Sequence, residues 1–156
     1  FARQVPSNKV TLNINNIIKD SLYFFEGKCE QSGIEVIINL SDSLPSVTAD
    51  PSQMTQVLID LVTNAIHAMP DGGRLEIKTC SSENCLFLIV EDTGKGMTEE
   101  TKKHIFNPFF TTKDVNQGTG LGLAVVHGIV SSHGGDIKLE SKEGKGTRFE
   151  IRIPLA

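Results

Sequence analysis

The segment QMTQVLIDLVTNAIHAM, from Gln53 to Met69, decides how this chain folds. It is apolar on nearly every side, which is typical of a helix buried in a core. Asp50 and Pro51, which precede it, suit the N-cap and the first helical position. Polar side chains nevertheless recur at helical spacing along it: Gln56, Asp60, Asn64 and His67. Because buried carboxylates and amides need partners, this polar stripe indicates either a ligand site or a capped or solvated edge of the helix.

Strands and helices flank this segment on both sides. Alternating or apolar runs predict strands at residues 9–15, 34–40, 74–80, 85–92, 136–141 and 147–155. Helical spacing predicts a helix over 14–33 and another that runs up to the HGG motif at 133–135, whereas 41–47 read as a turn region. This order predicts an α/β two-layer sandwich. We expect a mixed, mostly antiparallel sheet of about five strands, covered on one face by about three helices.

The composition limits the classes of partner. A chain of 156 residues suits one domain, and its net charge of -4 argues against nucleic acid as the main partner. No apolar run approaches a membrane span, and no stretch of the given residues reads as a signal peptide. The odd cysteine count of 3 favours reduced thiols in a cytoplasmic domain. Because the chain begins at Phe1 rather than Met, we expect a fragment whose anchor or further domains lie outside it.

A second polar feature is VEDTGKGM, from Val90 to Met97. Here a strand ends at Asp92, and a carboxylate at a strand end is held rigidly at the rim of a sheet. Gly94 and Gly96 follow at once, and glycines allow a ligand to approach the backbone. The alternative is a plain turn, because Asp-Thr-Gly is common turn chemistry.

The third feature is the glycine loop NQGTGLGLAVVHGIV, at residues 116–130. Its glycines, Gly118, Gly120 and Gly122, fit neither the dinucleotide fingerprint, whose last glycine place holds Leu123, nor a phosphate loop, which needs Gly-Lys-Ser or Gly-Lys-Thr. What remains is an anion site at a helix N-terminus or a flexible hinge. The stretch 97–117 before it has no clear pattern, which indicates a functional lid or disorder.

Together these pieces resemble the ATP-binding catalytic domain of sensor histidine kinases. That domain has the Bergerat fold, which DNA gyrase, a heat-shock chaperone and mismatch-repair ATPases share. QVLIDLVTNAIHAM is similar to its N box, DTGKGM to its first glycine box, IFNPFFTTK to its F box and GTGLGLAVV to its second glycine box. IVSSHGGDIKLES and GKGTRFEIRIPL are similar to its usual ending. The boxes occur in the right order over nearly the whole chain, which makes the resemblance specific.

The resemblance implies roles for individual residues. Asn64 corresponds to the amide that ligates the phosphate-bridging Mg²⁺, and Asp92 to the carboxylate that accepts a hydrogen bond from the adenine amino group. Thr147 corresponds to a hydroxyl near that adenine, often through water. In full, the resemblance assigns to nucleotide binding Asn64, His67, Asp92, Gly94, Gly96, Met97, Thr112, Lys113, Gly118, Thr119, Gly120, Leu121, Gly122, Leu123 and Thr147.

Two candidates for a direct part in catalysis remain, Lys113 and Asp60. Lys113 corresponds to a lid cation near the terminal phosphate, in a lid that aromatic residues pack down (Phe106, Phe109 and Phe110). Asp60 stands where many histidine kinases have Asn and the superfamily's ATPases have a Glu that activates water. It would act as a weak base, orient a water of the Mg²⁺ shell, or hold the lid. Gln56, one turn earlier, cannot act as a base.

The implied reaction is transfer of the γ-phosphoryl group of Mg²⁺·ATP to a histidine. An acceptor histidine is normally followed by Glu or Asp, whereas the 4 histidines here are followed by Ala68, Ile105, Gly128 and Gly134. We therefore expect the acceptor on a separate dimerisation domain of a dimeric parent, with a response regulator downstream. Residues 1–8 would end the linker from that domain, and 9–156 would form the catalytic domain with a lid at about 97–117. The alternatives are an ATPase of the same superfamily, an anti-sigma type serine kinase, or a degenerate nucleotide-binding module.

Overall fold

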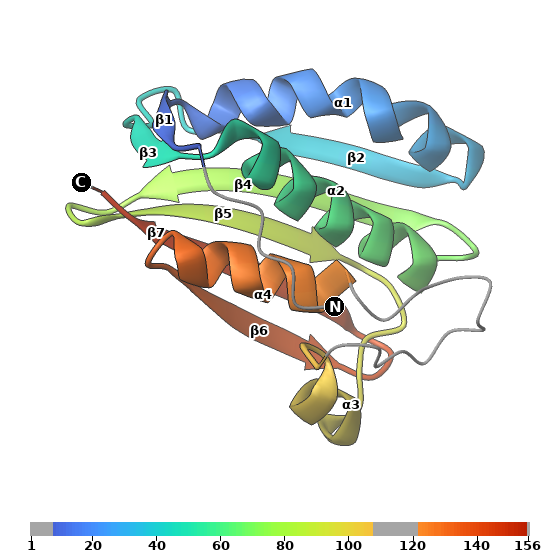
Figure 1. The fold of residues 1–156 in the computed structure, drawn as a ribbon. Coiled ribbons are helices and arrows are strands. Elements are labelled where there is room, and N and C mark those ends of the chain that lie inside the picture. The colour runs from blue at the N-terminus through green and yellow to red at the C-terminus, as the bar shows by residue number, and fades with distance from the viewer. Residues whose placement is uncertain (1–7, 108–121, 156) are drawn as a thin grey trace.

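The computed structural model describes residues 8–107 and 122–155, and its ribbon is drawn in Figure 1. Its strands form a five-stranded sheet, in the order β2-β4-β5-β7-β6, and a two-stranded sheet of β1 and β3. The strands are β1 (Val10–Leu12), β2 (Ile34–Asn39), β3 (Val47–Ala49), β4 (Gly73–Ser81), β5 (Cys85–Asp92), β6 (Asp136–Lys142) and β7 (Gly146–Pro154). The helices are α1 (Ile14–Gln31), α2 (Pro51–Ala68), α3 (Glu99–His104) and α4 (Gly122–Ser132).

The molecule has two layers, as the sequence predicts. Helices α1, α2 and α4 lie side by side on one face of the five-stranded sheet, with α2 in the middle (Figure 1). Only β2 and β4 run parallel; the other neighbours in this sheet are antiparallel, so the sheet is mixed and mostly antiparallel. The short helix α3 stands apart from these three, beyond the β6 edge of the sheet (Figure 1).

The strands alternate between a core face and an open face. On β5 and β7 the side chains that point toward the helices are apolar and buried: Leu86, Leu88, Val90, Phe149, Ile151 and Ile153. The opposite face carries charged pairs such as Arg148 and Glu150, whose Nη1 and Oε1 atoms lie 3.1 Å apart. This period of two is the pattern expected of a sheet that is covered on one side only.

Helix α2 begins where the sequence predicts. Asp50 is its N-cap, and its Oδ1 accepts a hydrogen bond from the N–H of Gln53 at 3.1 Å. The N–H of Asp50 donates to Nε2 of the buried His133 at 3.1 Å, and Nδ1 of His133 lies 2.8 Å from the carbonyl oxygen of Ile129. The histidine of the HGG motif therefore ties the end of α4 to the start of α2.

Three local expectations need correction. The strand predicted over 9–15 is limited to β1, because the Asn13 side chain accepts from the N–H of Asn15 and caps α1. The turn region predicted over 41–47 ends in β3, which is too short to show an alternation. The patternless stretch 97–117 contains α3, capped by the Thr98 hydroxyl, which accepts from the N–H of Thr101 at 3.1 Å.

Candidate functional site

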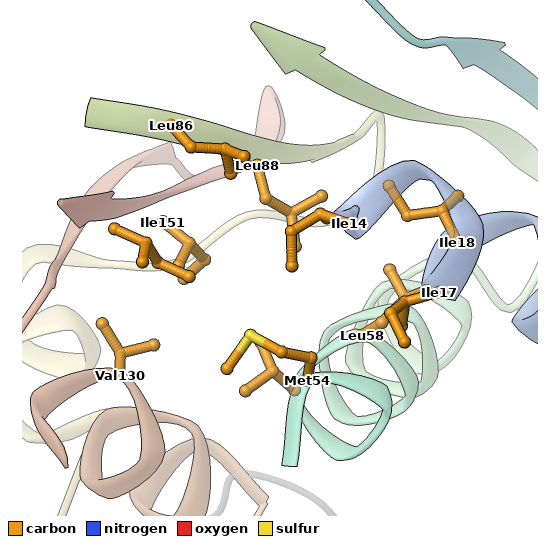
Figure 2. A pocket seen from close by; sticks show the side chains of 11 residues that line it. Ile14, Ile17, Ile18, Met54, Leu58, Leu86, Leu88, Val130 and Ile151 are labelled. Atoms are coloured by element: carbon orange, nitrogen blue, oxygen red, sulfur yellow. The ribbon is translucent and has the colours of Figure 1, made fainter. Parts of the chain in front are cut away.

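The two ends of the sandwich differ in chemistry. At one end a cavity of about 10 Å³ lies between the helices and the sheet, and every side chain that lines it is apolar (Figure 2). Because every lining side chain is apolar, a water molecule in this cavity would have no hydrogen-bond partner, so the cavity is expected to be dry. At the opposite end β5 finishes, β7 starts, α2 reaches its last turns and α4 begins. The predicted site residues in the described part of the chain gather at this polar end.

The polar stripe of α2 leads into this end. Gln56 is exposed, whereas Asp60, Asn64 and His67 are half-buried. The Nε2 of Gln56 donates to Oδ1 of Asp60 at 2.8 Å. A Cβ atom placed on Gly122, the first residue of α4, would lie 3.8 Å from Cγ of Asp60. Burial raises the pKa of Asp60 to about 6, although the hydrogen bond from Gln56 opposes the shift.

Asp92 is a buried carboxylate at the end of β5, with 5% of its surface exposed. Burial raises its pKa to about 6, and the nearby Glu91 adds to the rise. Backbone hydrogen bonds from Gly94 and Thr147 oppose it, the first with an N–O distance of 2.8 Å. The bond from Gly94 closes a local turn, so the turn that the sequence suggested is present. The carboxylate is nevertheless buried at a sheet rim, which a surface turn does not require.

Gly94 and Gly96 allow the segment after β5 to pack closely against α2 and the β6–β7 hairpin. A Cβ atom on Gly94 would lie 2.5 Å from the carbonyl oxygen of Ala68, at the end of α2. Gly96 has a φ of 68°, and a Cβ atom there would collide with the carbonyl oxygen of Lys142. The sequence suggested that these glycines admit a ligand. The structure adds that they bring the 94–97 segment against α2 and the β6–β7 hairpin.

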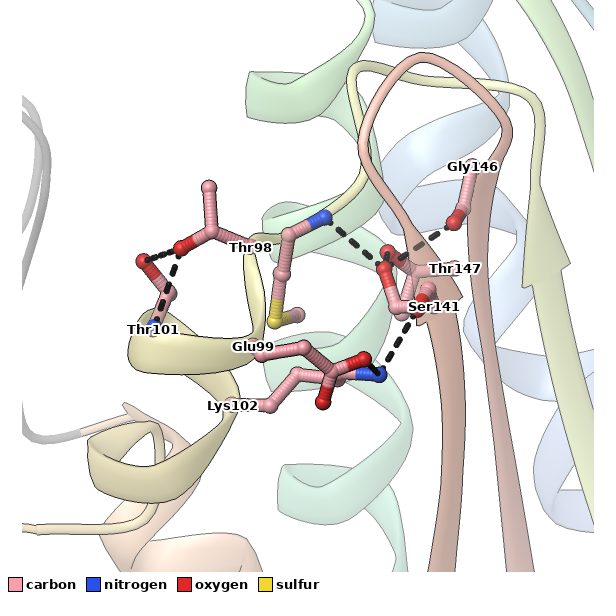
Figure 3. A network of polar contacts seen from close by, with 8 residues as sticks. Thr98, Glu99, Thr101, Lys102, Ser141, Gly146 and Thr147 are labelled. Carbon is pink, nitrogen blue, oxygen red and sulfur yellow. Dashed lines mark hydrogen bonds and ion pairs between the residues drawn. The ribbon is translucent and has the colours of Figure 1, made fainter.

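A hydrogen-bonded network links this segment to the β6–β7 hairpin (Figure 3). The N–H of Met97 donates to Oγ of Ser141 at 2.9 Å, and Oγ of Ser141 lies 2.9 Å from Oγ1 of Thr147. On α3, Nζ of Lys102 donates to the carbonyl oxygen of Ser141 at 2.9 Å and pairs with Glu99 at 2.8 Å.

Sequence reasoning missed two members of this network, Ser141 and Lys102. Ser141 was detectable in principle, because it follows Ile137 and Leu139 at the core-facing register of β6 and is a polar residue in an apolar series. Lys102 gave no such signal, since its partner is a backbone oxygen 39 residues away.

The lid is described only in part. The ring of Phe106 lies 5.5 Å from that of His127 and 6.3 Å from that of Phe149, centroid to centroid, so this predicted lid aromatic packs between α4 and the sheet. Leu123 is buried at the start of α4. The remaining predicted lid and loop residues lie outside the described residues: Phe109, Phe110, Thr112, Lys113, Gly118, Thr119, Gly120 and Leu121.

The described residues fit a magnesium ion that arrives with phosphates. They contain no group of three or more His, Cys, Asp or Glu side chains that could form a complete metal cage. Mg²⁺ bound to a nucleotide needs only one or two protein oxygens, since phosphates and waters fill the other positions. The half-buried amide of Asn64 carries an oxygen of the kind that could hold such an ion. Within the same part of the chain, no helix combines the length and the apolar character of a membrane span.

Comparison with known families gives one match to most of the chain. Residues 49–156 match the family described as histidine kinase-, DNA gyrase B-, and HSP90-like ATPase. The sensor histidine kinase ZraS of Escherichia coli K12 is 40% identical over 144 residues, which cover 92% of this chain and 30% of ZraS. Sporulation kinase E of Bacillus subtilis is 38% identical over 145 residues, covering 92% and 19%. The chain thus spans less than a third of the length of either relative.

Comparison with solved structures agrees with the sequence matches. The catalytic domain of the histidine kinase ThkA superposes with a TM-score of 0.84 at 35% identity, covering 94% of this chain and 97% of that domain. ThkA in complex with the response regulator TrrA matches with a TM-score of 0.80 at 32% identity, covering 95% of this chain and 42% of the ThkA chain.

Proposed function

This chain belongs to the family of histidine kinase-, DNA gyrase B-, and HSP90-like ATPases, and we propose that it binds Mg²⁺·ATP and transfers the γ-phosphoryl group to a histidine on a separate domain. It is a catalytic domain of the sensor histidine kinase type. The observation that carries the proposal is the buried carboxylate of Asp92, which lies directly opposite Thr147 in the β5–β7 ladder at the polar end of the sandwich.

In this proposal each polar group has a distinct task. Asp92 accepts a hydrogen bond from the adenine amino group, and Thr147 offers a second polar atom beside it. Asn64, on the half-buried stripe of α2, holds the Mg²⁺ that accompanies the phosphates. The ion would neutralise phosphate charge, and phosphoryl transfer depends mainly on such neutralisation and on positioning. Lys113, Thr112 and residues 118–121 keep their predicted roles at the phosphates.

The acceptor histidine belongs to another domain in this proposal. None of the 4 histidines of the chain is followed by Glu or Asp. His133 is buried, and both of its ring nitrogens lie within hydrogen-bond distance of backbone atoms, so it has no nitrogen available for phosphorylation. We accordingly keep the expectation that residues 1–8 lead from a dimerisation domain of the parent protein, and that a response regulator receives the phosphoryl group afterwards.

Incubation with ATP labelled at the γ-phosphate tests this reading. The chain alone should bind Mg²⁺·ATP and remain unlabelled, whereas addition of the histidine-containing domain of the parent protein should give a labelled partner. The label should survive alkali and be lost in acid, as a phosphoramidate is. Self-labelling of the chain at one of its own histidines would contradict the proposal.

Hydrolysis of ATP is the second candidate, and Asp60 is the observation in its favour. Its carboxylate is half-buried beside the first residue of α4, and a pKa of about 6 suits a general base near neutral pH. Release of free phosphate without an acceptor domain, abolished by Asp60→Asn while ATP still binds, would favour this reading. Phosphate release that is unchanged in Asp60→Asn would exclude Asp60 as the base.

A further inference from the structure

Ser141 is a buried hydroxyl at the crossing of three polar contacts, with 7% of its surface exposed. Its Oγ lies 2.9 Å from the N of Met97, 3.0 Å from the carbonyl oxygen of Gly146 and 2.9 Å from Oγ1 of Thr147. Figure 3 shows these contacts converging on Ser141. A serine hydroxyl has one proton to donate and two lone pairs that accept, so three contacts use its full capacity.

The direction of each hydrogen bond follows from the partners. The Met97 N–H can only donate, and the Gly146 carbonyl can only accept. If Ser141 gave its proton to Thr147, two oxygens would face each other 3.0 Å apart without a proton between Ser141 and Gly146. The arrangement that satisfies all the contacts has Ser141 donating to Gly146 and Thr147 donating to Ser141. The Thr147 hydroxyl proton is then engaged, and only its lone pairs remain for another partner.

The Thr147 hydroxyl, which can then only accept, lies beside a second acceptor, the carboxylate of Asp92. Ser141, Thr147 and Asp92 are register partners across β6, β7 and β5, and all three lie on the helix-covered face of the sheet. Opposite residues of this kind have Cβ atoms about 5 Å apart. The row thus presents a carboxylate and an acceptor-only hydroxyl, and it matches a base whose 6-substituent carries N–H donors.

We propose that Ser141 is a positioning residue that holds the Thr147 hydroxyl as an acceptor, so that the nucleotide site selects 6-aminopurines over 6-oxopurines. This inference rests on the proposed function, because it places the base of ATP against Asp92 and Thr147. A 6-oxo group has only lone pairs to offer, and it meets two acceptors in this row. Without the Ser141 hydroxyl, Thr147 can turn its proton toward the 6-oxo group.

Binding of ATP and of inosine triphosphate, which carries a 6-oxo group in place of the amino group, tests the proposal. Displacement of a fluorescent nucleotide in the presence of Mg²⁺ gives both dissociation constants for each variant. The parent should prefer ATP. Ser141→Ala should reduce this preference about tenfold, the size of one hydrogen bond, through tighter binding of inosine triphosphate. Thr147→Val should also reduce it, and Ser141→Ala should have no further effect in the Thr147→Val background.

Lys102→Ala is the matched control. It removes the bond to the Ser141 carbonyl oxygen and leaves the hydroxyl network intact, so it should leave the ratio of the two dissociation constants unchanged. The melting temperature of each variant, measured without nucleotide, separates loss of stability from loss of selectivity.

Three results would overturn the inference while the proposed function stands. They are a parent that binds both nucleotides equally, a Ser141→Ala variant that weakens both by the same factor, and a further loss of preference when Ser141→Ala is added to Thr147→Val. A parent that binds neither nucleotide would instead refute the proposed function, and the inference with it.

Discussion

Strands β5 and β7 extend from one end of the sandwich to the other, and their core-facing side chains differ in chemistry between the two ends. At the apolar end their core-facing residues are Leu86, Leu88, Ile151 and Ile153, which line a dry cavity together with α1, α2 and α4. At the polar end the same register continues with Asp92 and Thr147. A buried carboxylate costs stability, whereas a buried aliphatic side chain adds to it. The difference fits an apolar end that stabilises the fold, and it fits our proposal that the polar end is kept, at a cost in stability, for nucleotide binding.

The largest expected effect tests the apolar end. Leu58 of α2 is 1% exposed and lines the cavity, so Leu58→Ala should lower the free energy of unfolding by about 3 kcal/mol. Urea denaturation measures this loss. The affinity of the folded protein for Mg²⁺·ATP should stay within about twofold of the parent, because Leu58 lies at the far end from Asp92.

An exposed aromatic residue provides the control for that change. Tyr23 of α1 is 89% exposed, so Tyr23→Ala should alter the free energy of unfolding by less than about 0.5 kcal/mol. If Leu58→Ala reduced ATP affinity as strongly as it reduced stability, the two ends would be energetically coupled and the comparison would fail.

A substitution at the polar end should have the reverse effect of Leu58→Ala: it should weaken ATP binding and leave the free energy of unfolding undiminished. Asp92→Asn keeps an oxygen that can accept from the Gly94 N–H, but it places an amide donor where a carboxylate would accept from adenine. Loss of a charge-assisted hydrogen bond should weaken ATP binding about 100-fold. The free energy of unfolding at pH 7.5 should not fall, because the ionised carboxylate is disfavoured by burial. Calorimetric titration and urea denaturation of the same preparation measure both quantities, and unchanged ATP affinity would remove Asp92 from the site.

The sequence predicted the apolar end better than the polar end. Periodicity places α2 and the alternating core of β5 and β7, because burial and hydrogen-bond geometry impose regular spacing. The preference of Asp for the N-cap position places Asp50 at the start of α2. Short elements such as β3 are held by pairing with β1, which leaves no local pattern. Ser141 belongs to the site through contacts with Met97, 44 residues earlier, and with Thr147 across a hairpin. Such contacts depend on tertiary structure, so only a comparison of core-facing registers would have revealed this residue.

The pH dependence of stability gives a third test, centred on Asp60. Burial raises its pKa to about 6 from the ordinary aspartate value of 3.8, so between these values the folded state binds the proton more tightly than the unfolded state does. Stability should therefore fall as the pH rises through this window and stay level above it. Asp60→Asn removes this contribution. It should match the parent at pH 4 and exceed it by about 1 kcal/mol at pH 7.5, after allowance for partial exposure. Urea denaturation between pH 4 and pH 7.5 measures the difference in free energy of unfolding between the variant and the parent. An Asp60→Asn variant that is less stable than the parent at pH 7.5 would contradict the prediction.

The smallest expected effect concerns Gln56, at the exposed start of the polar stripe. Its amide donates to Asp60 and lowers the pKa of that carboxyl, in opposition to the effect of burial. Gln56→Ala should therefore raise the pKa of Asp60 further and extend the pH window of falling stability to higher pH. Because Gln56 is exposed, the change in the free energy of unfolding at pH 7.5 should stay below about 0.5 kcal/mol. Carbon-detected NMR titration of Asp60 in the parent and in Gln56→Ala measures the shift. A lower pKa in the variant would mean that Gln56 does not stabilise the ionised form, and the stripe would then be only a solvated edge at this position.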